Sequence, residues 1–192
     1  MTFPQTVING DAIVVAVSSW NSSSTANVTS ITDSQGNTYT KLAEVNSVEP
    51  LSVWIAQNVT GSSSLKVTVS STGASEFTVA LHEYTGMVSA SVVDKVVQSS
   101  GSNTAGLVTL SSSTNQPSEV LFSTFNHTSN FSPVLATAST GYTVRQSQTN
   151  NSLFEDLYTE DRVVSASGQY QAGVTFNHSV SWQGILISLK GQ

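Results

Sequence analysis

The stretch that decides the fold is residues 12–20, Ala-Ile-Val-Val-Ala-Val-Ser-Ser-Trp. In a strand, Ile13, Val15 and Val17 would point to one face, and the apolar residues between them would point to the other. Such a run is typical of a strand that is buried on both faces. It is also far shorter than the roughly 20 apolar residues that a membrane-spanning helix needs. We therefore expect a central buried strand and no membrane span.

Short apolar runs continue along the whole chain, rich in Val, Ile, Thr and aromatic residues and separated by Ser, Asn and Gly. The period of two and the residue preferences both favour strands joined by turns. The predicted class is all-β: a two-sheet antiparallel β-sandwich of jelly-roll or immunoglobulin-like type, as a single domain over residues 1–192. Further strands are expected at residues 27–32, 38–43, 51–57, 65–70, 77–84, 92–97, 107–110, 119–125, 142–145, 162–165, 170–176 and 182–189.

Three connecting segments have patterns of their own. Residues 33–37, Asp-Ser-Gln-Gly-Asn, predict a hairpin turn between the two strands that flank them, because Asp33 can accept backbone N–H groups and Gly36 can adopt a positive φ. Residues 98–103, Gln-Ser-Ser-Gly-Ser-Asn, predict a loop between two strands. Residues 151–161 predict a helical turn, because apolar side chains recur there every three to four residues.

The composition excludes several classes of function. Only 9% of the residues are charged, against about 25% in a typical domain, so hydroxyl and amide groups must supply most of the polar surface. Six Lys and Arg stand against twelve Asp and Glu, which excludes nucleic acid as a partner because the phosphates would stay unneutralised. The chain has no cysteine, so thiol nucleophiles, disulfides and cysteine metal sites are excluded too.

Four segments together resemble a known kind of module. They are residues 10–18 (Gly-Asp-Ala-Ile-Val-Val-Ala-Val-Ser), 32–39 (Thr-Asp-Ser-Gln-Gly-Asn-Thr-Tyr), 83–86 (Glu-Tyr-Thr-Gly) and the closing 182–190. Their order and spacing resemble a β-sandwich module of secreted and surface-displayed bacterial and archaeal proteins, including subunits of surface filaments or pili. The resemblance implies a non-catalytic extracellular building block. Such modules usually have one more strand before the Gly-Asp position, where this chain has residues 1–9.

No catalytic motif is recognisable: there is no Gly-x-Ser-x-Gly elbow, no His-Glu-x-x-His and no Gly-Lys-Ser/Thr phosphate loop. We therefore predict that the chain is not an enzyme. Glu83 has an unusual setting, because it shares a strand face with Phe77, Val79 and Leu81 and would lie at the edge of the core. A buried carboxylate needs partners, and we expect backbone amides or the turn at Gly86 to supply them.

Two chemical roles for Glu83 remain open alternatives. One is a catalytic acid in glycoside hydrolysis, which requires a second carboxylate about 5–10 Å away. The other is the assisting carboxylate of a Lys–Asn crosslink, for which Lys41 and Lys66 are the candidate lysines.

No cofactor is expected, although two patterns could bind a metal. Phe-Asn-His occurs at residues 125–127 and 176–178, so His127 and His178 could share a metal ion if those strand ends are adjacent. Polar strand ends are the simpler interpretation, since no third ligand is evident. Calcium has one candidate group of carboxylates, whose spacing matches no known calcium loop: Glu155, Asp156, Glu160 and Asp161.

The sequence has two features that could involve glycans: an aromatic residue that could bind sugar, and sequons that could carry it. Trp54 lies opposite the apolar face of its strand and could point outward, so with Tyr39 or Tyr84 it could stack on a sugar; burial under a second layer is the alternative. Sequons of the form Asn-x-Ser/Thr predict candidate glycosylation sites, although a chain so rich in these residues generates several by chance. They begin at Asn21, Asn27, Asn58, Asn126, Asn130, Asn150 and Asn177.

These observations predict a non-enzymatic structural or adhesive module, located outside the cell or on its surface, whose partners are copies of itself or neighbouring surface modules. Association by strand addition is the expected mode, because a sandwich that lacks one strand leaves a sheet edge unpaired. Phe3, Val7 and Ile8 could form that strand within the chain or be donated to a neighbour. The alternative function is a carbohydrate-binding module that uses Trp54.

Overall fold

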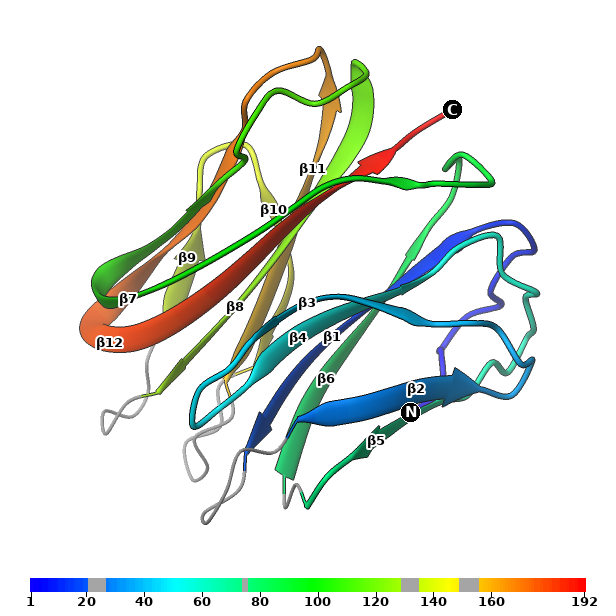
Figure 1. The fold of residues 1–192 in the computed structure, drawn as a ribbon, viewed down its shortest axis with the longest axis horizontal. Coiled ribbons are helices and arrows are strands. Elements are labelled where there is room, and N and C mark those ends of the chain that lie inside the picture. Colours follow the sequence, from blue (N-terminus) through cyan, green and yellow to red (C-terminus); the bar gives the residue numbers. More distant parts are fainter. Residues whose placement is uncertain (21–26, 74–75, 129–134, 149–155) are drawn as a thin grey trace.

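The computed structural model describes residues 1–20, 27–73, 76–128, 135–148 and 156–192 (Figure 1). The described residues form strands and no helix, and therefore no helix that could cross a membrane. This confirms the all-β sandwich. The strands are β1 (Ala12–Trp20), β2 (Val28–Asp33), β3 (Thr40–Val45), β4 (Leu51–Ala56), β5 (Val67–Ser71), β6 (Glu76–Tyr84), β7 (Val93–Thr109), β8 (Ser118–Thr128), β9 (Ala136–Ala138), β10 (Thr143–Gln148), β11 (Leu157–Ser165) and β12 (Gln171–Lys190).

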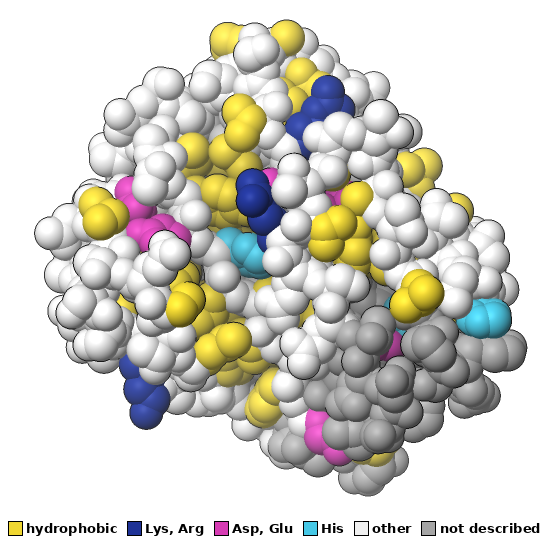
Figure 2. All heavy atoms as spheres, turned by 180° about the vertical axis from the view of Figure 1, so that it is seen from behind, with side chains coloured by type: hydrophobic (Ala, Val, Ile, Leu, Met, Phe, Trp, Pro, Cys, Tyr) yellow, Lys and Arg dark blue, Asp and Glu magenta, His cyan; other side chains and the backbone are white. Residues whose placement is uncertain are grey.

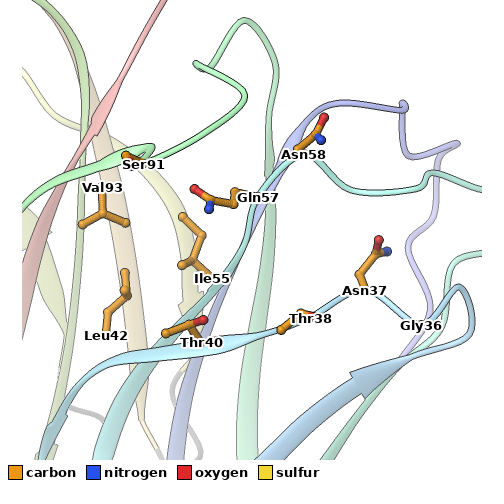
Figure 3. Close-up of a pocket in the computed structure, with 10 residues that line it drawn as sticks. All are labelled: Gly36, Asn37, Thr38, Thr40, Leu42, Ile55, Gln57, Asn58, Ser91 and Val93. Carbon is orange, nitrogen blue, oxygen red and sulfur yellow. The ribbon is translucent and has the colours of Figure 1, made fainter.

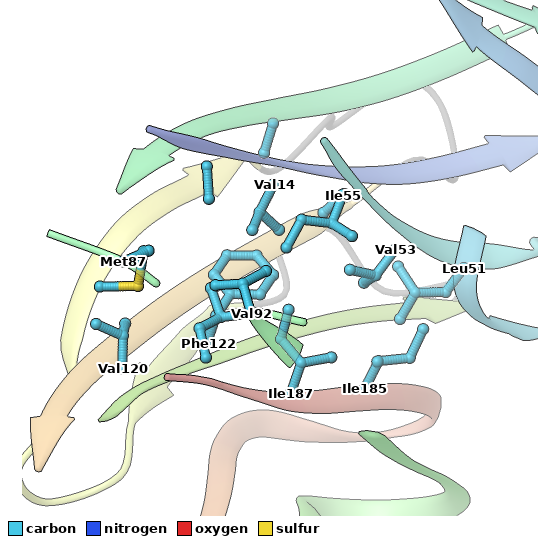
Figure 4. Close-up of a cluster of buried hydrophobic side chains, with 14 of the residues drawn as sticks. Val14, Leu51, Val53, Ile55, Met87, Val92, Val120, Phe122, Ile185 and Ile187 are labelled. Atoms are coloured by element: carbon cyan, nitrogen blue, oxygen red, sulfur yellow. The ribbon is translucent and has the colours of Figure 1, made fainter. Parts of the chain in front are cut away.

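Two antiparallel sheets form the centre of the molecule. The N-terminal sheet has the strand order β3-β4-β1-β6, and the C-terminal sheet has the order β10-β11-β8-β12-β7. Their facing sides share one apolar core, to which Val14 contributes from β1 and Phe122 from β8 (Figure 4). Because this core takes side chains from both sheets, neither sheet could bury its inner face without the other.

A smaller layer covers the outer face of each sheet. The N-terminal flap consists of β2, β5 and residues 1–8, and it packs over β1 and β4 through a second apolar cluster. The C-terminal flap is made by β9 and by the parts of β7 and β12 near residues 104–109 and 171–176. These two strands bend sharply and fold back over their own sheet (Figure 1). A third apolar cluster lies under this flap.

Strand β1 is buried on both faces, as its sequence predicts. Ala12, Val14 and Ala16 contribute to the central core, whereas Ile13 and Val15 contribute to the cluster under the N-terminal flap. The doubly apolar run is therefore explained by a layer on each side of the sheet.

The two halves of the chain repeat one topology, which we did not predict from the sequence. Strands β1, β2, β3, β4, β5 and β6 correspond in order and pairing to β8, β9, β10, β11 and the first and second parts of β12. Strand β7 lies between the halves. A shared register shift fixes the equivalent residues: Lys41 pairs with Trp54 just before the shift in β3, and Val144 pairs with Glu160 just before the shift in β10. Trp54 therefore corresponds to Glu160, and the strand pairings then make Val14 equivalent to Phe122.

Irregular features repeat as well as regular ones. The pairing of β3 with β4 shifts register between Lys41 and Ala43, and the pairing of β10 with β11 shifts between Val144 and Gln146. The backbone N–H of Val7 donates to Ser62 (3.0 Å), and the equivalent N–H of Thr114 donates to Gly168 (3.0 Å). Matching bulges and matching loop bonds indicate a repeated structural unit, because a chance similarity of strand order would not extend to them.

Three local predictions are wrong. Residues 33–37 form the predicted turn, with Gly36 at φ 76°, but they do not close a hairpin, because β2 pairs with β5 and β3 pairs with β4. Residues 98–103 lie within β7, where the facing part of β12 satisfies their backbone groups. Residues 157–161 belong to β11 and are not helical; the rest of the predicted helical turn, 151–155, lies outside the described residues.

Candidate functional site

A groove runs along the outer edge of β6, where the sandwich is open. We call it the β6 groove; it has a volume of about 450 Å³. In Figure 2 a histidine side chain lies close to a Lys or Arg side chain in a hollow, with apolar side chains around them. The residues that line the groove are Leu81, His82, Glu83, Tyr84, Thr85, Val120, Arg145, Asp161 and Val163.

Asp161 of β11 holds the two walls of the β6 groove together. Its Oδ2 accepts a hydrogen bond from the Tyr84 hydroxyl of β6 (3.0 Å) and another from Arg145 Nε of β10 (2.8 Å). Burial, and then the Asp161 carboxylate, raise the pKa of Tyr84 well above its usual value, so the hydroxyl stays protonated and donates. The arrangement therefore links the N-terminal sheet to the C-terminal sheet.

His82 lies beside this link as a neutral side chain. Its ring centroid is 5.0 Å from that of Phe122, and burial lowers its pKa to about 4. Nε2 is buried and makes no hydrogen bond within the described part of the chain. An imidazole in this state adds apolar packing and no charge at neutral pH.

Glu83 points to the opposite face of β6, toward the N-terminal flap. Its Oε1 accepts the backbone N–H of Ile8 at 2.8 Å, so a backbone amide is its partner, as the sequence predicts. Burial, and then the neighbouring Glu83 carboxyl, raise the pKa of Asp11 to about 6. Two carboxyl groups thus share a small region at one end of β6. The candidate lysine Lys41 pairs instead with Glu44 at 3.0 Å, and Lys66 lines a different pocket, near Met1.

A second pocket, of about 670 Å³, lies beside the edge strand β3 and the start of β7 (Figure 3). Amides and hydroxyls line one side of it and Leu42, Ile55 and Val93 the other. Several of its amides are already used by the fold: Asn37 exchanges hydrogen bonds with the backbone of Thr60, and Gln57 Oε1 accepts the N–H of Val92. The described lining residues include no aromatic side chain.

The predicted sugar-stacking residues do not form an exposed platform. Trp54 is 6% exposed; its indole N–H donates to Ser52, and it lies under the N-terminal flap. Tyr39 is buried and donates its hydroxyl to Asp33 at 3.0 Å, while Tyr84 is bound to Asp161. Of the two alternatives for Trp54, the structure has burial under a second layer, because the N-terminal flap covers this face of the sheet.

The sequons occupy different environments. Asn58 and Asn177 are exposed and Asn27 is partly buried. Asn126 is 1% exposed, and its Nδ2 donates to Ser18 Oγ and to the carbonyl of Glu49. The nitrogen that would carry a glycan is therefore part of the core, which contradicts this candidate site. The sequons at Asn21, Asn130 and Asn150 lie outside the described residues.

The N-terminal residues stay within their own chain. Phe3 and Val7 belong to the N-terminal flap, and their side chains are buried in the apolar cluster between the flap and the sheet. Their backbone N–H groups donate to the carbonyls of Leu65 and Ser62. Ile8 is 53% exposed. Of the two alternatives for residues 1–9, the structure therefore has the strand-like segment within the chain, along the β5 side of the flap.

Within the described residues, the candidate metal patterns do not form a group of three or more His, Asp or Glu side chains that could hold a metal ion. His127 is buried, has its pKa lowered to about 4 by burial and lies 3.0 Å from Asp156, so a neutral imidazole contacts that carboxylate. Asp161 is bound to Arg145. Glu155 lies outside the described residues.

Glu160, the remaining member of the acidic group, has a setting that the sequence analysis missed. It is fully buried under the C-terminal flap, where Ser123 Oγ donates to its Oε1 (3.0 Å). Burial raises its pKa to about 7. The alternation of β11 carries a signal for this, because Tyr158, Glu160 and Arg162 share one face while Asp161 lies on the other.

Neither a protein-family model, a curated protein nor a solved structure matches this chain. In the β6 groove, Asp161 binds Tyr84 and Arg145, His82 is buried and neutral, and Glu83 binds a backbone amide, so these ionisable groups serve to hold the fold together. The edge of β6 beside them pairs with no strand in the described part of the chain.

Proposed function

We propose that this chain is a non-enzymatic structural module of the cell surface or the extracellular space that associates with copies of itself or with neighbouring modules. The observation that carries the proposal is the unpaired edge of β6, next to a groove with apolar walls. Unpaired edges are sites of strand addition unless they are covered or charged. The low charge of the chain and its exposed sequons support an extracellular setting.

Association is tested by sedimentation of the purified chain over a hundredfold range of concentration, and by electron microscopy of native material. We expect concentration-dependent association or filaments. A chain that stays monomeric throughout, and that forms no assembly with other surface proteins in its native setting, would contradict the proposal. The intact mass of the native protein tests the sequons, and Asn58→Gln with Asn177→Gln should remove any mass that glycans add.

Sugar binding is the second candidate, and one observation favours it: the neutral amide and hydroxyl lining of the pocket in Figure 3. A glycan array probes it, with Thr40→Val as the matched variant because that change removes a lining hydroxyl and keeps the shape. Binding that Thr40→Val abolishes would favour this function. Trp54→Ala would not be informative, since Trp54 is buried.

A further inference from the structure

We propose that the outer edge of β6 is an acceptor for an extended strand of another polypeptide. This strand would pair with β6 in the way that β7 pairs with β12 in the other half of the chain. This inference rests on the proposed function and deepens it, since it specifies the edge, the register and the chemistry of the partner strand. It follows from the repeat, because the two halves agree in strand order and pairing and in the register shift of β3 and β10, and they differ at this edge.

The equivalent edge in the C-terminal half is filled. The second part of β12 corresponds to β6, and β7 pairs with it antiparallel through partners that include Leu186↔Val97 and Ser188↔Lys95. The N-terminal sheet ends at β6 in the described part of the chain. Alternate residues of an edge strand direct their N–H and C=O groups away from the sheet, so β6 offers a ladder that a strand can complete.

Space for the side chains of such a strand exists on both faces of β6. In β7, Val96 packs on the central core and Val97 packs on the cluster under the C-terminal flap. Beside β6, the β6 groove lies on the His82 face, and a pocket of about 320 Å³ lies on the other face, between Val79 and the N-terminal flap and two residues along β6 from Leu81. An added strand with one apolar residue opposite His82 and the next opposite Leu81 would place one side chain in the β6 groove and the other beside this second pocket, the arrangement used in recognition by strand addition.

The side chains of the C-terminal sheet that lie across from the unpaired edge of β6 are exposed, because no described strand covers them. Strand β3 has β7 across from it, and Leu42 and Val93 both pack against the central core. Strand β10 corresponds to β3, and the described residues place no strand across from it. Arg145, which corresponds to Leu42, has a 50% exposed side chain, and Val163 of β11 is 76% exposed. A strand added to β6 would cover both of these side chains.

Charge indicates what the partner carries at one position. Glu83 corresponds to Ser188, which faces Lys95 of β7. Glu83 and Asp11 place two carboxyl groups at this end of β6, so a lysine in the equivalent position would offset their repulsion. The partner is therefore an extended segment with a lysine opposite Glu83, followed by two branched apolar residues opposite His82 and Leu81.

The probe is a synthetic peptide with the sequence of residues 92–103, Val-Val-Asp-Lys-Val-Val-Gln-Ser-Ser-Gly-Ser-Asn, added to the purified full chain. Hydrogen exchange read by mass spectrometry should show slower exchange in residues 79–84 when the peptide is present. The other edge of the same sheet, β3, is the internal control and should not change. A peptide with Asp in place of both central valines should give no protection, because a charge would enter each apolar pocket.

The charged contact has its own matched variants. Glu83→Gln should weaken binding of the peptide roughly threefold and should have no effect on a peptide in which Gln replaces the lysine. Glu76→Gln, at the other end of β6, should change neither affinity. Equal losses from Glu83→Gln with both peptides would contradict the proposed register.

A second experiment avoids the weak affinity expected of a free peptide. The same twelve residues are fused before Met1 through a short flexible linker, which raises their effective concentration at the β6 edge. We expect a higher Tm than for a fusion with the doubly charged sequence, and slower exchange in residues 79–84. If neither the peptide nor the fusion protects β6 more than β3, the inference is overturned. Filaments or self-association in that case would show that assembly uses another surface, so the proposed function would survive.

Discussion

The two halves of the molecule fill the same position beneath their flaps with opposite chemistry. In the N-terminal half, Val15 faces Trp54, and both are apolar and buried. At the equivalent pair in the C-terminal half, Ser123 faces Glu160, and both are also buried. One topology thus accepts either a tryptophan or a hydrogen-bonded carboxyl group. The strand pairing determines where the side chains go, and local packing determines which ones fit.

A second pair of equivalent positions differs in how side-chain volume is divided between two paired strands. Val17 faces Val79 in the N-terminal sheet, whereas Phe125 faces Gly184 in the C-terminal sheet. A Cβ added to Gly184 would lie 2.5 Å from Phe125 Cε1, so this glycine is required by a close approach of the ring. The two halves therefore conserve total volume at this position and not the individual residues.

The largest expected effect tests whether the halves are energetically independent. Phe122 and Val14 are equivalent residues in the shared central core. Phe122→Ala should lower the free energy of unfolding by about 4 kcal/mol, and Val14→Ala by about 2 kcal/mol, through lost burial and the cavities left behind. Calorimetry should show a single unfolding transition for both variants. Two separate transitions would mean that each half folds on its own.

The next effect concerns the buried carboxyl group of Glu160. Because its folded-state pKa is about 7, above the 4.5 of an unperturbed glutamate, the stability it contributes is complete below pH 4.5 and is lost as the pH rises through 7. Glu160→Gln keeps the acceptor for Ser123 and cannot ionise. It should therefore stabilise the chain by roughly 3 kcal/mol at pH 8 and by little at pH 4.5.

Urea unfolding of the Glu160→Gln variant and the unmodified chain at several pH values measures this difference. His82 and His127 serve as an internal contrast, because their pKa values are lowered to about 4. Their contribution is lost as the pH falls below about 6.5, in both proteins alike. If the stability difference between the two proteins does not grow from pH 5 to pH 8, the pKa of Glu160 is not raised in the folded chain.

A smaller effect tests the exchange of volume. Gly184→Val should cost about 1–3 kcal/mol, because its side chain overlaps Phe125. Adding Phe125→Val recreates the Val–Val pair of the N-terminal half. The double variant should be more stable than the sum of the two single losses predicts, by about 1 kcal/mol or more in a double-mutant cycle. Strict additivity would show that the two positions are not equivalent in packing.

The smallest effect is expected at the register shift of β10. Arg145 corresponds to Leu42, and its side chain is half exposed even though it binds Asp161. Exposed ion pairs contribute little, so Arg145→Leu should change the free energy of unfolding by less than about 1 kcal/mol. Thermal unfolding of this variant beside Leu42→Ala provides the comparison. A loss well above 1 kcal/mol would show that the bond from Arg145 to Asp161 stabilises the pairing of β10 with β11 more strongly than its exposure suggests.

Much of the fold could be predicted because strand patterns are local. The double burial of β1, the positive φ of Gly36 and the acceptor role of Asp33 follow from residue types and their spacing. The predicted hairpin does not form, because β2 pairs with β5, which lies some 35 residues away in the sequence. No turn residue encodes that choice of partner. Residues 98–103 form part of β7 although their Ser and Gly content is typical of a loop, because pairing with β12 holds them in a strand.

The candidate site was less predictable. The bonds of Asp161 to Tyr84 and Arg145 join three strands from two sheets. The sequence leaves open whether Trp54 is exposed or buried, since nothing local reveals that a flap covers it. The repeat also escaped notice, because a Val–Val pair in one half corresponds to Phe–Gly in the other and the residue types no longer match.

The all-β class and the hydroxyl-rich, weakly charged composition of this protein can be read from its residues alone, because period-two apolar patterns and composition are local properties. Strand pairing, the repeat of one unit and the β6 edge, which in the described part of the chain has no strand where its counterpart has β7, are visible only in the folded molecule. Pairing depends on contacts between residues far apart in the chain, and their free energy is realised only when both sheets and both flaps are in place.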